Sequence, residues 1–120
     1  MPKFIREPTR IQAAGNKVKI ISEFIGYVNT KDSAVSVALM NSPSGWKEPG
    51  QTPEFDEYSI VLKGMLHVKC AESEYDVEAG QAIKVNRNEW VQYSTPFPEG
   101  AQYLSVCLPA FTPEIVHRDE

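Results

Sequence analysis

Hydrophobic and polar positions alternate with a period of two along most of the chain, and no stretch carries the 3.6-residue period of an amphipathic helix. The alternating segments are rich in β-branched and aromatic residues, and most of the nine prolines and seven glycines fall between them. This pattern predicts strands over residues 17–26, 34–40, 57–64, 65–70, 73–80, 81–88, 89–95 and 101–110.

The breaks in the pattern indicate how these strands are connected. Lys63 and Gly64 fit a hairpin, and residues 86–88 fit a turn because asparagine tolerates the left-handed backbone. Residues 113–120 can form one helical turn at most. Many short, evenly spaced strands are typical of a β-sandwich or barrel, which closes its sheet edges and leaves an interior cavity. We therefore expect an all-β fold.

Length, charge and cysteine content limit the classes of function. The 120 residues suffice for one compact domain, and a net charge of −4 without any basic run argues against binding to nucleic acids or anionic membranes. The chain has neither an apolar run long enough to span a membrane nor the hydrophobic segment of a signal peptide, so we expect a cytoplasmic protein. Cys70 and Cys107 are interpreted as reduced thiols.

The segment from Gly45 to Gly64 has the spacing of a metal-binding loop that leads into a strand, but it contains no histidine. Its spaced positions are Gly45, Gln51, Pro53, Glu57 and Gly64. A second spaced set follows at Gly80, Asn86, Asn88, Val91 and Thr95. The spacing of both sets resembles the two motifs of the cupin family. Cupins carry metal-binding histidines at the positions that Gln51, Pro53 and Val91 occupy here.

The resemblance covers about Ser42 to Leu108 and implies the cupin fold, a double-stranded β-helix or jelly-roll barrel. We expect one cupin domain over residues 1–120, with an N-terminal extension at 1–16 and a C-terminal tail at 109–120. Homodimers are common in this family, and the most frequent closed assembly is a twofold pair. The expected interface is the outer face with Tyr58, Ile60, Leu62 and Trp90.

The histidine substitutions bear on cofactors. A typical cupin binds a transition metal through three imidazoles and one carboxylate. Glu57 is the only one of these four metal ligands that is retained here, so we expect no cofactor, and a divalent metal enters only in the alternative function given below. Inside a barrel Glu57 is either a hydrogen-bonded structural group or a desolvated acid with a raised pKa that can transfer a proton. The sequence leaves both interpretations open.

Strand alternation supplies the other candidate residues. Val91 and Tyr93 share one face, which the resemblance places inside the barrel, and Tyr93 joins Glu57 as the candidate catalytic pair. Cys107 belongs to the polar face of the last strand, and His117 or Arg118 can reach the cavity if the tail docks over its mouth. The candidate ligand-binding residues are Gln51, Glu57, Val91, Tyr93, Cys107 and His117.

Three functions are consistent with these residues. The favoured one is a pocket that binds a small polar ligand, such as a carbohydrate-derived molecule, without metal, either as a binding module or as an isomerase or epimerase that uses Glu57. The alternative is a metal-dependent dioxygenase or isomerase, whose divalent ion would be held by Glu57, Gln51, Glu54 and His117. The third is a homodimer with a purely structural role. The sequence does not decide whether the protein is an enzyme.

Overall fold

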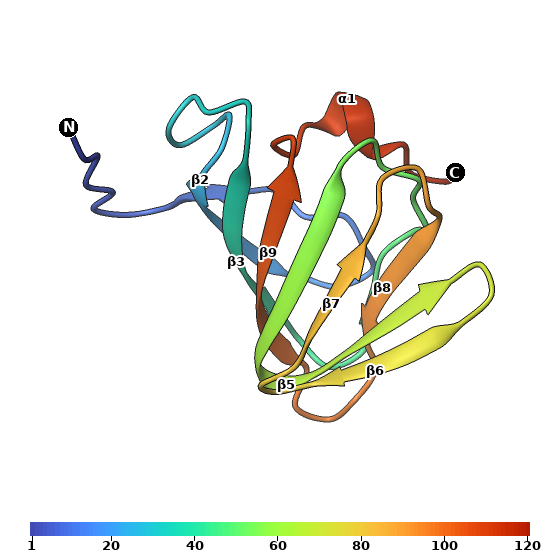
Figure 1. The fold of residues 1–120 in the computed structure, drawn as a ribbon. Helices are drawn as coiled ribbons and strands as arrows, with labels where there is room; N and C mark the ends of the chain where they lie inside the picture. Colours follow the sequence, from blue (N-terminus) through green and yellow to red (C-terminus); the bar gives the residue numbers. More distant parts are fainter.

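The computed structural model describes residues 1–120 as a nearly all-β protein with one short helix (Figure 1). Each predicted strand region overlaps an observed strand, but the predicted strands at 57–64 and 65–70 are one continuous strand, and two short strands, β1 and β4, were not predicted. Their bounds are β1 Thr9–Ile11, β2 Ile20–Ile25, β3 Ser36–Ser42, β4 Trp46–Lys47, β5 Asp56–Cys70, β6 Glu74–Glu78, β7 Ala82–Val85, β8 Val91–Thr95, β9 Ala101–Leu108 and α1 Pro113–Val116.

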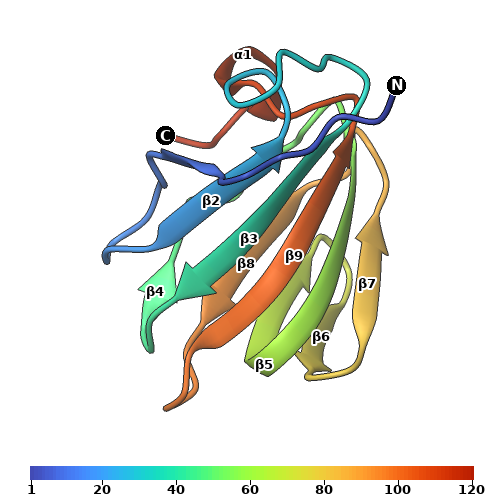
Figure 2. The ribbon, with the colours of Figure 1, turned by 90° about the vertical axis from the view of Figure 1, so that its left-hand side faces the viewer.

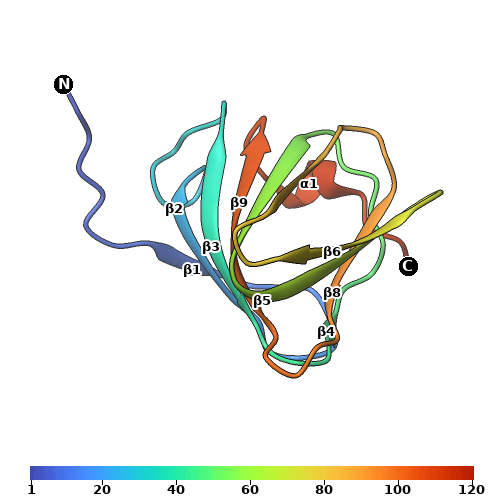
Figure 3. The ribbon, with the colours of Figure 1, turned by 60° about the horizontal axis from the view of Figure 1, so that its bottom comes forward.

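The strands form two antiparallel layers that share β5. One layer has the order β1-β2-β3-β9-β5, with β7 on the other edge of β5, and the broad face of β2, β3, β9 and β5 is seen in Figure 2. The other layer joins the second half of β5 to β6 and β8, and β4 pairs with β8. Viewed from below, the layers curl around a common interior (Figure 3). This is a jelly-roll barrel, as the strand spacing predicted.

Strand β5 passes from one layer to the other through a kink at Gly64, so the predicted hairpin at Lys63 and Gly64 is wrong. The register with β9 shifts between Val61 and Lys63, and Gly64 has a φ of 73°. A Cβ atom at Gly64 would lie 2.1 Å from the carbonyl oxygen of Gly100, an oxygen that accepts a hydrogen bond from the Met65 amide. Glycine is needed here for a bend within a strand and a close backbone approach.

The barrel interior is filled unevenly. Ten buried side chains form the main core at the end where β5, β6 and β8 meet: Trp46, Val61, Leu66, Val68, Val77, Val85, Val91, Tyr93, Ala101 and Tyr103. A second cluster of Phe55, Cys107 and Val116 lies under the C-terminal segment. The cavity lies between the two clusters, and its walls combine apolar side chains with buried polar and charged ones.

Both ends of the chain take part in the barrel. Residues 9–11, within the predicted N-terminal extension, form β1 and pair with β2, while Ala13 and Ala14 reach the cavity wall. The tail docks beside residues 50–54: the Thr52 amide donates to the His117 carbonyl at 3.1 Å, and the Asp119 amide donates to the Gly50 carbonyl at 2.7 Å. No helix in the structure has the length and apolar character that a membrane span requires.

Candidate functional site

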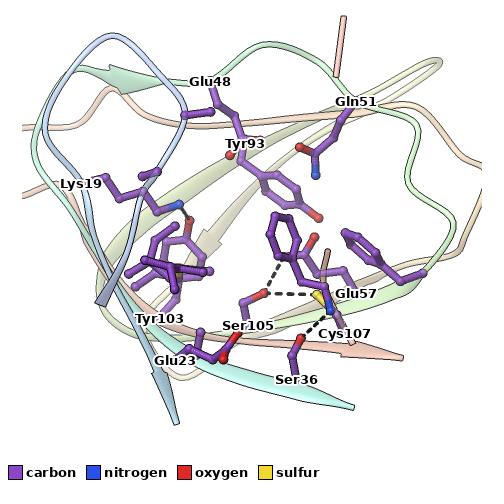
Figure 4. A pocket seen from close by; sticks show the side chains of 18 of the residues that line it. Lys19, Glu23, Ser36, Glu48, Gln51, Glu57, Tyr93, Tyr103, Ser105 and Cys107 are labelled. Atoms are coloured by element: carbon purple, nitrogen blue, oxygen red, sulfur yellow. Dashed lines mark hydrogen bonds between the residues drawn. The ribbon is translucent and has the colours of Figure 1, made fainter. Parts of the chain in front are cut away.

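A cavity inside the barrel is enclosed by β2, β3, β5, β8 and β9 together with the loop before β2, the loop after β4 and the docked tail (Figure 4). About 60 Å³ is open to the centres of water molecules, which is enough for several waters or a ligand with a few heavy atoms. Its polar or ionisable lining residues are Lys19, Glu23, Ser36, Glu48, Gln51, Glu57, Tyr93, Tyr103, Ser105, Cys107 and Arg118.

Glu57 is the second residue of β5, and its side chain lines this cavity. Its Oε2 accepts a hydrogen bond of 2.5 Å from the Ser105 hydroxyl, which is presented by the neighbouring strand β9. Burial raises the pKa of Glu57, although the Ser105 hydrogen bond, the positive charge of Lys19 and the nearby Tyr93 hydroxyl oppose the shift. The Tyr93 hydroxyl lies close to the carboxylate without forming a hydrogen bond of ordinary geometry. The predicted polar face of β9 is confirmed, because Tyr103, Ser105 and Cys107 all line the cavity.

Cys107 is placed in the cavity wall but is not an activated thiol. Burial and the negative charge of Glu57 raise its pKa well above the ordinary value. A nucleophilic cysteine needs the opposite shift, toward the thiolate form. Cys107 therefore contributes volume and a weak hydrogen-bonding group to the cavity, and it is not arranged for attack on a ligand.

A buried lysine, which the sequence interpretation missed, lies on the opposite side of the cavity. Lys19 is only 8% exposed, and its Nζ donates a 2.6 Å hydrogen bond to the Tyr103 hydroxyl. The same Nζ lies 3.8 Å from the centroid of the Trp46 ring, a cation–π distance. Burial lowers the pKa of Lys19 to about 8, even though the carboxylates of Glu48 and Glu57 favour its charged form.

Glu48 lies directly after β4. It is the second cavity residue, after Lys19, that the sequence interpretation missed. It is 9% exposed and lines the cavity near Lys19. Burial raises its pKa to about 7, with Lys19 acting in the opposite direction. A carboxyl group with this pKa can take up or release a proton near neutral pH. The cavity therefore holds two acids and one amine whose charge states are all sensitive to a bound ligand.

Four buried side-chain polar atoms have no hydrogen-bond partner in the protein, and two of them belong to residues that line the cavity. These two are Oε1 of Gln51 and the hydroxyl oxygen of Tyr93, and both side chains point toward the centre of the cavity in Figure 4. Gln51 is held in place by its backbone, whose amide and carbonyl groups each bond to Val91 at 2.9 Å. Buried polar atoms are nearly always paired, so these two mark positions that a ligand or ordered water would complete.

Two of the predicted ligand-binding residues lie elsewhere. Val91 is fully buried, but it packs in the main core and is not part of the cavity lining. His117 is exposed and its Nε2 contacts the Glu54 carboxylate outside the barrel. Residues alternate in direction along the docked tail, so it is the next residue, Arg118, that reaches the cavity. Tyr93, Gln51, Glu57 and Cys107 are brought together as expected.

The residues present do not fit a transition metal. Of the positions that carry histidine in typical cupins, Gln51 offers one neutral amide oxygen, and Pro53 and Val91 offer no donor atom. The Glu57 carboxylate is engaged by Ser105, and Glu54 and His117 pair with each other at the surface. No three His, Cys, Asp or Glu side chains gather as a metal-binding group. The ligand set of the metal-dependent alternative is thus split between two places.

The missed residues gave little signal in the sequence. Lys19 interrupts the apolar run before β2, and Glu48 lies in a turn-like stretch between Lys47 and Pro49. Both read as ordinary surface charges because such residues are rarely buried. Only the alternation of Lys19 with Ile21 and Glu23, which share an inward face, could have placed it.

A closed jelly roll whose polar side chains converge on an interior cavity is the architecture of the cupins, and solved structures agree. The chain aligns over 98% of its length with the polyketide cyclase RemF from Streptomyces resistomycificus, covering 84% of that chain with a TM-score of 0.73 and 18% identity. It also matches the Cnp3 cupin domain of Schizosaccharomyces pombe, with a TM-score of 0.67, 10% identity, and coverage of 76% of this chain and 61% of that one. The protein therefore has the cupin fold.

The sequence is also similar to a named protein. Over 101 residues, or 84% of this chain, it is 42% identical to a protein named endoribonuclease YbeY from Myxococcus xanthus. The chain spans only 34% of that relative's length, so the name describes a much longer protein. No protein-family model matches the sequence.

Proposed function

We propose that the protein binds a small, neutral or weakly charged polar molecule with hydroxyl groups in the barrel cavity, without the three-histidine metal site of typical cupins. The observation that carries this proposal is the pair of unpaired buried polar atoms, Gln51 Oε1 and the Tyr93 hydroxyl. A hydroxyl group can donate to the first and accept from the second. The apolar walls, including Trp46 and Met40, suit the carbon skeleton of such a ligand.

Charge supports the same class of ligand. Lys19 and Arg118 bring positive charge to the cavity, and Glu23, Glu48 and Glu57 bring negative charge. Glu23 is occupied, because its Oε2 accepts hydrogen bonds from the Val28 and Asn29 amides. The remaining charges are nearly balanced, so neither a strongly anionic nor a strongly cationic ligand is favoured.

A proton-transfer reaction is the second candidate function. The raised pKa of Glu57 and the pKa of about 7 for Glu48 are suited to a general acid or base that acts on a bound hydroxyl or C–H group. Tyr93 is a poorer proton donor, because burial raises its pKa well above the ordinary value. In an isomerase or epimerase of this kind Glu57 would carry the proton and Tyr93 would hold the substrate.

We predict that Gln51→Met and Tyr93→Phe each weaken ligand binding without destabilising the ligand-free protein. Each variant removes an unpaired buried polar atom, so the free energy of unfolding without ligand should stay constant or rise by about 1 kcal/mol. Each should also weaken the binding of hydroxylated ligands about tenfold. The measurement is thermal unfolding of the three proteins with a panel of polyols, simple sugars and hydroxy acids, followed by titration calorimetry of the best ligand.

The matched control is Ser59→Ala. Ser59 Oγ is also buried and unpaired, but Ser59 does not line the cavity. Its loss should leave the ligand response unchanged. The proposal is contradicted if no member of the panel stabilises the wild-type protein, or if Ser59→Ala and Tyr93→Phe reduce the response equally.

A homodimer in the cytoplasm is the proposed state of the protein. Two unpaired thiols, Cys70 and Cys107, are compatible with that compartment. The outer face of β3, β9 and β5 carries apolar side chains in register across three strands, and no other segment covers it (Figure 2). These residues are Val37, Leu39, Tyr58, Ile60, Leu62, Leu104, Val106 and Leu108. A flat apolar sheet face of this kind can pack against its own copy around a twofold axis.

Ile60→Lys is expected to dissociate this dimer. Ile60 is 40% exposed and pairs with Leu104 near the middle of the outer face, so a lysine would place two charges in the proposed interface. The dissociation constant should increase by about 100-fold, as measured by light scattering across a concentration series. Tyr75→Lys is the control, because Tyr75 is 49% exposed and lies on β6. A wild-type monomer, or equal effects of both variants, would contradict the proposal.

A further inference from the structure

Lys19 is buried in an arrangement that a structural role does not explain. Lysine is almost never buried unless it is paired with a carboxylate, yet Lys19 makes no ion pair. Its Nζ is held by the Tyr103 hydroxyl at 2.6 Å and by the face of Trp46 at 3.8 Å. These contacts fix the position of the nitrogen at the cavity wall while leaving donor capacity unused, since an ammonium group has three donors.

The groups around Nζ are suited to proton exchange. Glu48 and Glu57 are the acids that face it, Arg118 is the other cation, and the Tyr103 hydroxyl is in direct contact. Because burial lowers the pKa of Lys19 to about 8, roughly a tenth of the population carries a neutral amine at pH 7. An ordinary lysine, with a pKa near 10.4, has a neutral fraction smaller by a factor of a few hundred.

We propose that Lys19 captures a small hydroxyaldehyde or hydroxyketone in the cavity as an imine. The ammonium group first gives one proton to the Glu48 carboxylate. The neutral Nζ then adds to the carbonyl carbon, the carbonyl electrons move to oxygen, and one of the two Nζ protons transfers to that oxygen to give a neutral carbinolamine. The hydroxyl group then leaves as water with a proton from the Glu48 carboxyl group, and a C=N bond to Nζ forms. Starting from the ammonium form, one carbonyl compound is consumed and one water and one iminium are produced, so atoms and charge balance.

This inference rests on the proposed function for its ligand class, since Gln51 and Tyr93 would hold the hydroxyl groups while Lys19 meets the carbonyl. The volume of about 60 Å³ open to the centres of water molecules suits a compound of about three carbon atoms. The amine, the two unpaired atoms and the two acids come from four different segments of the chain and meet in this cavity (Figure 4).

The test is reductive trapping with dihydroxyacetone and cyanoborohydride near pH 7, followed by peptide mapping. The reduced adduct is expected on Lys19 at an initial rate at least tenfold above that of Lys17. Lys17 is a matched control, because it lies two residues away and its exposed Nζ donates only to the Ser44 carbonyl. Lys19→Met should remove the main adduct, and the urea-unfolded wild-type protein should lose the preference for Lys19. Glu48→Gln should slow the labelling without moving it.

The results separate this inference from the binding proposal. Equal labelling of Lys19 and Lys17 in the folded protein overturns the imine inference, whether or not Lys19→Met folds. Stabilisation by dihydroxyacetone without an adduct on Lys19 also overturns it and leaves the binding proposal intact. Selective labelling of Lys19 that is as fast with acetone as with dihydroxyacetone supports the reactive amine, and it contradicts the role of Gln51 and Tyr93 in holding hydroxyl groups.

Discussion

Gly64→Ala is expected to lower the free energy of unfolding by about 3 kcal/mol or more, which is roughly a 10 °C decrease in Tm. Gly64 has a φ of 73°, in the left-handed region, where alanine is conformationally strained. Its Cβ would also lie 2.1 Å from the Gly100 carbonyl oxygen, so one of the two backbones must move. That movement separates β5 from β9, the two strands that carry Glu57 and Ser105. Urea unfolding of both proteins measures the difference.

Gly80→Ala is the control for the backbone term. Gly80 has a similar φ of 87°, but a Cβ at this position would meet no atom within 4 Å. Its cost should therefore be the conformational penalty alone, about 1 kcal/mol. Equal costs for the two variants would show that the close approach between Gly64 and Gly100 does not constrain the bend in β5.

Stability is expected to increase as the pH falls from about 7 to about 4.5. In the folded protein the pKa of Glu48 is about 7 against an ordinary value of 4.5, so between these values the folded state binds a proton that the unfolded state does not. The stabilisation is therefore fully present below pH 4.5 and is lost as the pH rises through 7. The difference corresponds to about 3 kcal/mol, which urea titrations at about pH 5 and pH 7.5 can resolve.

The other titrating groups do not reverse this trend. Glu57 and His67 also have raised pKa values, so they act in the same direction as Glu48. The lowered pKa of Asp56, caused by its hydrogen bonds with Arg87, reduces stability only in more acidic solution. Lys19 has a pKa lowered to about 8, so its contribution to the free energy of unfolding changes mainly in alkaline solution. Glu48→Gln should remove most of the acid stabilisation, and a variant with the wild-type slope would contradict the assignment to Glu48.

The same carboxyl groups connect stability to ligand binding. Keeping Glu48 and Glu57 ionised inside the barrel costs folding free energy, and a ligand hydroxyl that donates to either group would offset part of that cost. A ligand should therefore stabilise the protein more at neutral pH than at acidic pH. A structural carboxylate pair would give no such dependence, so the panel experiment with polyols and hydroxy acids has more power when it is run at both pH values.

Much of the fold and part of the candidate site could be predicted from local patterns. Period-two alternation located the strands, and the spacing from Gly45 to Gly64 and onward from Gly80 indicated the cupin barrel. Alternation within β9 also correctly placed Tyr103, Ser105 and Cys107 on the cavity side. These predictions succeed because the direction of a side chain in a strand depends on its own backbone.

The predictions failed at positions whose structure depends on contacts between segments that are distant in the sequence. Gly64 has the local signature of a turn, but the approach of Gly100 turns the position into a bend within one strand. The tail was expected to offer His117 to the cavity as readily as Arg118, and the register of its pairing with residues 50–54 turns Arg118 inward. Val91 lies on the same inward face as Tyr93, as predicted, but it packs among the side chains of the main core and does not reach the cavity.

The sequence by itself determined that the chain forms a β-barrel and that a cupin's histidines are replaced by groups unable to hold a transition metal, because alternation and residue identity are local properties. Only the tertiary structure decided that Lys19 and Glu48 are interior residues beside Tyr103 and Glu57. Burial depends on which segments cover a side chain, and the covering segments here come from both ends of the chain. Desolvation of these charged groups changes their pKa values, and the chemistry of the cavity follows from that change.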